Sequence, residues 1–371
     1  MTRNMLLQES FSARPRLWLG LLGLLGLTLA MPARTATLCP ATGPVPADFQ
    51  WGLVAYHVNF PGYELQADDL TRMAQNGIQW IRVDFAWGRI EPEQGGDFDF
   101  RYFDELVAAA KANGIRIAGT LGNGYNTRMR PVAPLWTHGL SGPQYVAALG
   151  RYADAVVARY ADDVDTWGLE NELHIAALHV LLGWRSHVYP LQINHEILRT
   201  LSQAVDLHDP NAQIVLTLSP APGWRRFVRQ STQRFRFDAV GLYSYPSFNA
   251  GAVPTGFEAE IANQIAEARE ASGGKEVLIF ETGYQTPPDK PRTPEDEGSL
   301  LRDHQATYIE TMVRSAVDGG AAGVYFYQYL DNPDELLPRE EVFGLVKPDR
   351  TPKPAWTRYG EIIGACSAQT P

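Results

Sequence analysis

The sequence predicts an α/β fold: a single (β/α)8 barrel of the TIM-barrel type, with long βα loops after its third and seventh strands. Eight short apolar runs alternate along the 371-residue chain with longer amphipathic stretches. Regular alternation of strand and helix is typical of a parallel sheet, and eight such units are the number that closes a barrel. No linker separates the units, so one domain is expected over residues 37–371.

The predicted strands are the apolar runs, and each is followed by a stretch long enough to form the helix that leads to the next strand. This order predicts parallel strands whose carboxyl ends meet at one mouth of the barrel. In chain order, strands are expected at residues 51–56, 78–85, 115–121, 163–170, 213–219, 237–244, 276–282 and 322–329.

Two of the predicted helices have clear end signals. Residues 100–114 have apolar positions at helical spacing and end in Asn-Gly, and residues 294–320 start with proline and acids and end in Gly-Gly. The loops at 121–143 and 286–298 follow strand ends, where such barrels keep their active sites, so both are predicted to form walls of a cleft. The other helices are expected at 66–76, 141–161, 190–208, 222–233, 257–271 and 354–363.

Residues 1–36 predict export. Arg3, Arg14 and Arg16 precede the apolar run 17–30, which is followed by small residues. These 14 apolar residues are too few for the ~20 needed to span a bilayer, so the segment is predicted to be a signal peptide, with an uncleaved N-terminal anchor as the alternative. The mature protein is therefore expected to be periplasmic or secreted.

The two cysteines, Cys39 and Cys366, lie near the two ends of the expected mature chain. In an oxidising compartment they are predicted to form a disulfide, and two unpaired thiols are the alternative. No metal-ligand motif and no phosphate-binding glycine loop is present, so no metal or cofactor is expected. A net charge of −10 argues against nucleic acid as a partner, since that binding depends on Lys and Arg neutralising phosphates.

Two predicted strand ends carry carboxylates in apolar surroundings. Residues 164–174 read VDTWGLENELH, which places Glu172 after the fourth strand, and Glu281 ends the seventh. A buried carboxylate without partners is costly, so these groups either belong to a structural ion-pair network or perform chemistry. Two carboxylates that face each other are the apparatus of glycoside hydrolysis, in which one donates a proton and the other attacks the sugar or activates water.

Arg82 and His57 are expected at the same mouth, since they end the second and first strands. Arg82 would favour the charged form of a neighbouring carboxylate, whose negative charge would in turn raise the pKa of the second carboxylate. His57 could reach a substrate hydroxyl, and a structural role is its alternative. Arg82 could therefore keep one carboxylate ionised and the other protonated near neutral pH, as the proposed chemistry requires.

Several motifs resemble those of the retaining glycoside hydrolases of clan A, with the closest likeness to family 39 and the related family 5. They are WGLENEL at 167–173, VLIFETGY at 277–284, the segment 81–100 and the tail 331–356. The resemblance implies that Glu172 is the general acid/base and Glu281 the nucleophile. It also implies that Asn171 binds the sugar 2-hydroxyl and that Arg82 keeps Glu281 ionised.

The resemblance extends to the ends of the sixth and eighth strands, with departures. Tyr245 matches a tyrosine that relatives place near the nucleophile, whereas Tyr243 stands where they have a histidine. Relatives often supply a tryptophan from the eighth strand as the floor of the sugar site, and here Gln328 and Tyr329 occupy that region. Tyr243, Tyr245 and Gln328 are therefore expected to bind substrate together with Asn171, Arg82 and His57.

The sequence as a whole predicts an exported, monomeric, retaining β-glycosidase that acts on an oligo- or polysaccharide. Two alternatives stay open: a barrel that binds a polysaccharide without cutting it, and a transglycosylase. A wide separation of the two carboxyl groups would instead indicate an inverting enzyme, with Glu281 as the base.

Overall fold

The computed structural model describes residues 39–55, 64–122, 126–127, 130–181, 191–246, 254–286, 297–332 and 340–368. Residues 1–38, which include the predicted export signal, lie outside this part of the chain. Thr37–Pro371 forms one compact unit. Within the described ranges, no helix is both long enough and apolar enough to cross a membrane.

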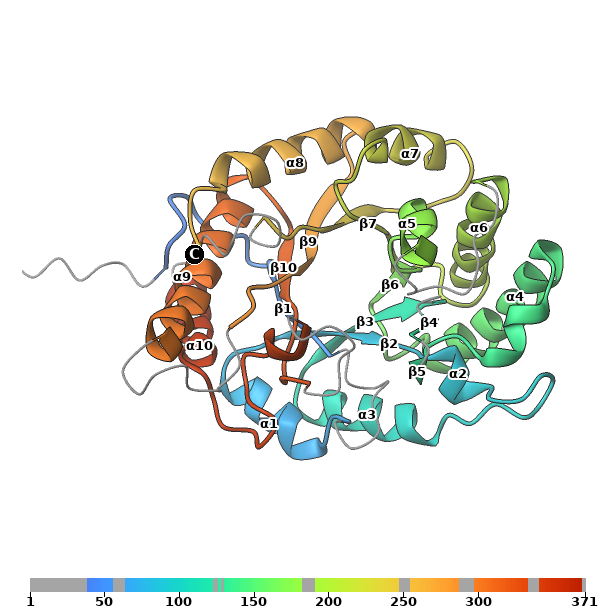
Figure 1. Cartoon of the computed structure of the whole chain (residues 1–371), viewed down its shortest axis with the longest axis horizontal. Helices are drawn as coiled ribbons and strands as arrows, with labels where there is room; N and C mark the ends of the chain where they lie inside the picture. The colour runs from blue at the N-terminus through green and yellow to red at the C-terminus, as the bar shows by residue number, and fades with distance from the viewer. Residues whose placement is uncertain are drawn as a thin grey trace, which may run out of the picture. The chain divides into compact units, whose positions relative to one another are not determined.

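Eight parallel strands close into a barrel in the order β1-β10-β9-β8-β7-β6-β3-β2 (Figure 1). Closure is visible at β1, where Leu53 pairs with Ile81 of β2 on one side and with Phe326 of β10 on the other. The predicted (β/α)8 barrel is confirmed. The strands are β1 (Gln50–Val54), β2 (Trp80–Asp84), β3 (Arg116–Leu121), β6 (Thr166–Leu169), β7 (Gln213–Leu218), β8 (Ala239–Tyr243), β9 (Glu276–Thr282) and β10 (Gly323–Phe326).

Helices surround the strands on the outside of the barrel (Figure 1). At the start of α4, the Gln144 side chain accepts a hydrogen bond from the backbone N–H of Ser141 at 2.9 Å, which satisfies a donor that the helix itself leaves unpaired. The outer helices are α1 (Ala67–Gln75), α3 (Arg101–Ala112), α4 (Gly142–Tyr160), α6 (Leu191–His208), α7 (Trp224–Ser231), α8 (Glu258–Ala271), α9 (Glu297–Asp318) and α10 (Pro354–Ser367).

Several short elements lie within the βα loops and were not predicted, because they are too short to have a periodic pattern. The loop after β3 contains a two-stranded antiparallel ribbon, and the described part of the loop after β6 contains a 3-10 turn followed by a short helix. These elements are α2 (Trp87–Ile90), β4 (Asn126–Thr127), β5 (Arg130–Pro131), α5 (Ala176–Leu181) and the 3-10 turns Leu135–Gly139, Leu173–Ile175 and Glu340–Val342.

The inside of the barrel is filled by aromatic and branched side chains, which include Trp80, Phe280 and Tyr325. Gly52 makes room for Tyr325, because a Cβ atom at Gly52 would lie 2.3 Å from the tyrosine ring. The Tyr325 hydroxyl donates to the Gln50 side chain at 2.6 Å. The interior is thus a packed core, so substrate can bind only at an end of the barrel.

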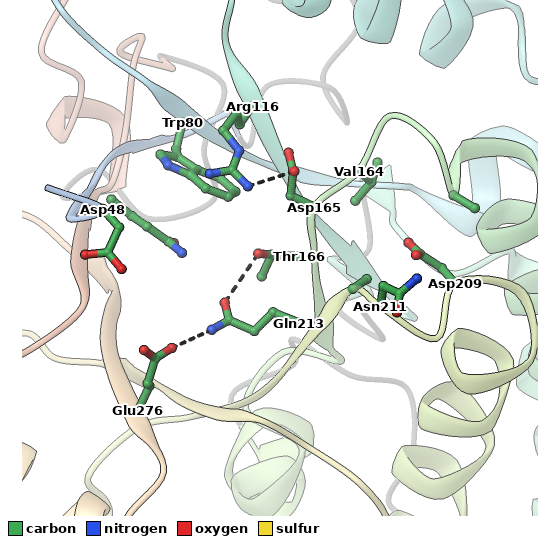
Figure 2. A pocket seen from close by; sticks show the side chains of 13 residues that line it. Asp48, Trp80, Arg116, Val164, Asp165, Thr166, Asp209, Asn211, Gln213 and Glu276 are labelled. Carbon is green, nitrogen blue, oxygen red and sulfur yellow. Dashed lines mark hydrogen bonds and ion pairs between the residues drawn. The ribbon is translucent and has the colours of Figure 1, made fainter.

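A cavity of about 440 Å³ lies at the amino-terminal ends of the strands. Figure 2 shows the side chains that line it. Arg116 lies over the Trp80 ring at 4.1 Å and bonds to Asp165 at 2.7 Å. Gln213 bridges Thr166 and Glu276, so polar groups drawn from several strands satisfy one another here. This end of a barrel generally contributes to stability.

Cys39 and Cys366 form a disulfide across a sequence separation of 327 residues, with their Cα atoms 4.8 Å apart. Both cysteines are buried, and Cys366 lies in α10. The bond therefore ties the segment before β1 to the last helix of the barrel.

Replacing both cysteines (Cys39→Ser with Cys366→Ser) is expected to lower the free energy of unfolding by about 2–5 kcal/mol, since a cross-link over a long loop restricts the unfolded chain. Urea unfolding of the variant and of the oxidised wild type measures the difference. Reduced wild type serves as the matched control and should unfold at the midpoint of the variant. Equal midpoints for variant and oxidised wild type would contradict the prediction.

Candidate active site

The candidate site lies at the carboxyl ends of the strands, where Arg82 of β2, Tyr243 of β8 and Glu281 of β9 come together. Tyr243 and Glu281 are register partners of neighbouring strands. Arg82 reaches Glu281 from across the barrel, because β2 and β9 are not adjacent in the sheet. Residues 199 positions apart in sequence thus form one contact.

Each oxygen of the Glu281 carboxylate receives a hydrogen bond. Arg82 Nη1 donates to Oε2 at 2.6 Å, and the Tyr245 hydroxyl donates to Oε1 at 2.6 Å. The Glu281 side chain is 15% exposed, so one side of it is open to the mouth of the barrel. Two donors to one carboxylate favour its ionised form and fix its orientation.

Arg82 is 1% exposed, and its buried charge has several partners besides Glu281. It donates to the Thr120 hydroxyl at 3.3 Å and to the backbone oxygen of Phe280 at 3.2 Å. Its guanidinium lies 4.6 Å from the centre of the Tyr243 ring, and Asp84 is 3.9 Å away. A planar guanidinium can satisfy all of these directions at once, which a lysine ammonium cannot.

Burial raises the pKa of Glu281 above its ordinary value. The charge of Arg82 and the hydrogen bond from Tyr245 act against this rise, whereas the negative charge of Glu172 adds to it. Arg82 therefore acts in the predicted direction, but burial has the larger effect on Glu281. For Arg82, burial alone would lower the pKa, but Tyr243, Glu281 and Asp84 outweigh burial and raise it.

Glu172 lies in the turn that follows β6, and its charge acts on Glu281 and on Tyr243, so the structure places both predicted catalytic carboxyl groups at one mouth. Glu170 and Glu172 have left-handed backbones, with φ of 57° and 51°. Asn171 is buried between them, and its backbone N–H donates to the Glu170 carboxylate at 3.2 Å. Non-glycine residues in this conformation are strained and concentrate at functional sites.

Three aromatic rings form a wall beside Glu281. The Tyr245 ring lies edge-on to Phe343 at 5.9 Å and to Tyr327 at 6.5 Å, and Tyr327 and Phe343 are 5.5 Å apart. Phe343 was not predicted as a site residue, although it lies within the 331–356 tail that carries part of the resemblance, because nothing in that motif singles out this aromatic. Tyr327 directly follows β10, within the aromatic run YFYQY at 325–329, and this run could have indicated it.

The segment after β2 is braced from within. The buried Glu91 carboxylate accepts from Trp87 Nε1 at 2.8 Å and from Arg151 at 3.0 Å, and Trp136 donates to the Glu91 backbone oxygen at 3.1 Å. These contacts join the loops after β2 and β3 to helix α4. The segment 81–100, which carries part of the resemblance, is thus fixed in place next to the loop after β3.

The remaining predicted residues have different outcomes. Gln328 follows β10 and is fully buried, and within the described part of the chain its side-chain oxygen and nitrogen have no hydrogen-bond partner. Its role in substrate binding stays a prediction. His57 lies outside the described residues. Among the residues that are described, no group of three or more His, Cys, Asp or Glu could hold a metal ion.

Comparison with known proteins finds that parts of the chain are similar to glycosidases. A glycoside hydrolase family 42 model, described as β-galactosidase, matches residues 59–137. A β-glucosidase from Agrobacterium sp. is 30% identical over 130 residues, which are 34% of this chain and 26% of that protein. The chain spans about a quarter or less of the length of the curated relatives it matches.

Solved structures share the fold. A GH5_18 protein from Streptomyces cattleya has a TM-score of 0.69 at 18% identity, over 87% of this chain and 82% of that one. A family 39 glycoside hydrolase from Bacteroides cellulosilyticus has a TM-score of 0.60 at 17% identity, over 86% of this chain and 63% of that one. The chain resembles the clan A glycoside hydrolases. The resemblance predicted from the sequence motifs is confirmed.

Tyr245→Phe is expected to raise the pKa of Glu281 further, because the variant loses a hydrogen bond that stabilises the ionised carboxylate. The measurement is a carbon-13 NMR titration of the glutamate side-chain carboxyl groups, with Glu281→Gln to assign the signal. Tyr284→Phe is a matched control, since the Tyr284 hydroxyl faces His304 at 3.4 Å rather than Glu281. A Glu281 midpoint in Tyr245→Phe that equals or falls below that of wild type would contradict the prediction.

Proposed function

We propose that this protein is an exported retaining β-glycosidase that hydrolyses a β-linked glycan by double displacement. The observation that carries the proposal is the Glu281 carboxylate, held by Arg82 and Tyr245 at one mouth with Glu172. Further support comes from the β-glucosidases and β-galactosidase to which parts of the sequence are similar.

In the first step, a Glu281 oxygen attacks the anomeric carbon of the sugar, and the glycosidic bond breaks. Glu172 gives its proton to the departing oxygen, so the leaving group departs as a neutral alcohol. A glycosyl ester on Glu281 remains, and Glu172 is now ionised. In the second step, Glu172 takes a proton from water, the water oxygen attacks the anomeric carbon, and Glu281 is released as a carboxylate.

The charges at the site suit this sequence of protonation states. In the free enzyme, the negative charge of Glu281 favours the protonated form of Glu172, which is the form that donates. Ester formation removes that negative charge, and the ionised form of Glu172 that must accept a proton is then favoured. Arg82 stabilises Glu281 before the first step and after the second, when it is a free carboxylate.

The substrate is proposed to be a β-linked hexoside at the end of, or within, a larger glycan. Asn171, which lies between the two left-handed glutamates, is proposed to bind a sugar hydroxyl beside the reacting carbon. The wall of Tyr245, Tyr327 and Phe343 offers aromatic surface next to Glu281, and sugars stack on such surfaces. The Cys39–Cys366 disulfide supports export to an oxidising compartment.

Release of sugar from a panel of aryl β-glycosides and polysaccharides tests the proposal. Wild type is expected to hydrolyse at least one of them, and Glu281→Ala and Glu172→Ala are each expected to lose about 10²–10⁴-fold or more in kcat/KM. Glu276→Ala is the matched control, since Glu276 starts the same strand as Glu281 and contacts Gln213 at the opposite end of the barrel. Its kcat/KM should equal that of wild type.

Two results would contradict the proposed hydrolase and indicate a different function. Saccharide binding that survives Glu281→Gln, with no sugar released by wild type, would indicate a binding protein. Products larger than the substrate, accumulating at high substrate concentration, would indicate a transglycosylase.

A further inference from the structure

The turn that carries Glu172 has an unfavourable backbone. The left-handed conformations at Glu170 and Glu172 cost on the order of 1–3 kcal/mol each, and such residues persist only where the surrounding structure holds them. The backbone N–H of Glu170 still bonds to β3, where it donates to the Leu121 oxygen at 2.8 Å. After Glu170 the chain no longer follows the hydrogen-bonded strands of the barrel, so other groups must hold the backbone of the turn.

Thr217 of β7 supplies one such group. Its hydroxyl lies 3.0 Å from the backbone oxygen of Leu169 and 2.7 Å from that of Glu170. The second oxygen belongs to the peptide that joins Glu170 to Asn171. A single hydroxyl proton is therefore shared by the two carbonyl groups at which the strand becomes the catalytic turn.

The Thr217 hydroxyl is itself held rigidly. Thr217 is 2% exposed and pairs in register with Gly241 of β8. Its methyl group faces Gly168, where a Cβ atom would lie 3.4 Å from it. β-Branched side chains have few χ1 conformations, so this packing fixes the direction of the hydroxyl. Valine would fill the same space, so packing alone does not account for a hydroxyl here.

Asn194 of α6 holds the other end of the turn. Its side-chain nitrogen donates to the Leu173 backbone oxygen at 3.3 Å, directly after Glu172. Asn194 is buried, and its side-chain oxygen has no hydrogen-bond partner among the residues that the structure describes. The turn from Leu169 to Leu173 is thus held from β7 on one side and from α6 on the other.

We propose that Thr217, with Asn194 at the far end of the turn, is a positioning residue that aims the Glu172 carboxyl group at the glycosidic oxygen. The proposal rests on the acid/base role of Glu172 in the proposed function. Thr217 is buried, and in this proposal it acts only through the backbone of Glu170 and Asn171. Its loss should therefore impair proton donation while leaving attack by Glu281 in place.

Two leaving groups separate these steps. Dinitrophenolate leaves a dinitrophenyl β-glycoside without needing a proton, whereas the phenolic oxygen of a phenyl β-glycoside must be protonated as it leaves. For both substrates, kcat/KM reports the reaction up to cleavage of the glycosidic bond. The sugar is the one that wild type hydrolyses fastest. Thr217→Val should lose about 100-fold in kcat/KM on the phenyl glycoside, the loss expected for a catalytic group displaced by about 1 Å, with little change on the dinitrophenyl glycoside. Thr217→Ser, which keeps the hydroxyl, should restore activity on the phenyl glycoside.

Thr166→Val is the matched control. Thr166 is a buried threonine at the start of β6, and its hydroxyl bonds to Gln213 at the opposite end of the barrel (Figure 2). Thr166→Val should leave the ratio of kcat/KM on the phenyl glycoside to kcat/KM on the dinitrophenyl glycoside unchanged. Asn194→Ala gives a second test if Thr217→Val does not fold, and it should show the same selective loss.

Equal losses on both substrates in Thr217→Val, or no loss on either, would overturn the positioning role while leaving the proposed hydrolase intact. Glu172→Ala measured in parallel separates the two ideas. If Glu172→Ala keeps full activity on the phenyl glycoside, Glu172 is not the acid/base and both proposals fall.

Discussion

The buried ion pair between Arg82 and Glu281 is the constraint on which the site depends. Withdrawing two charges from water costs several kcal/mol per ion, and the cost is met only where every remaining donor and acceptor finds a partner. Arg82 accordingly bonds to Thr120 and to the Phe280 backbone, and it lies over Tyr243. The Tyr245 hydroxyl donates to the second oxygen of the Glu281 carboxylate, and its ring belongs to the aromatic wall. The proposed nucleophile and the proposed sugar-binding surface therefore share one network of contacts.

The two ends of the barrel differ in how their polar groups are satisfied. At the amino-terminal ends of the strands, Arg116, Gln213 and Glu276 bond to neighbours in ordinary strand geometry. At the carboxyl ends, Glu170 and Glu172 hold left-handed conformations that depend on support from β7 and α6. The barrel thus concentrates backbone strain at the end where chemistry is proposed, and its opposite end and packed core provide the stability that offsets it.

The sequence was sufficient to predict the eight strands and the convergence of Arg82, Glu172 and Glu281, because apolar runs locate strands and a closed parallel barrel brings their carboxyl ends together. It was not sufficient to predict Phe343, Thr217 or Asn194. These residues reach the site through tertiary contacts, and in sequence they look like any loop aromatic, strand threonine or helix asparagine. The net effect of burial on Glu281 likewise depends on packing that only the folded chain supplies.

The central claim, that Glu281 is the nucleophile of a retaining glycosidase, is tested most directly by trapping the intermediate. A dinitrophenyl 2-deoxy-2-fluoro-β-glycoside slows both chemical steps and carries a leaving group good enough for the ester to accumulate. Mass spectrometry of the digested protein should then find the fluorosugar on the peptide that contains Glu281, and on none in the Glu281→Gln variant. A fluorosugar attached to Glu172, or rapid turnover with no adduct on any peptide, would contradict the account.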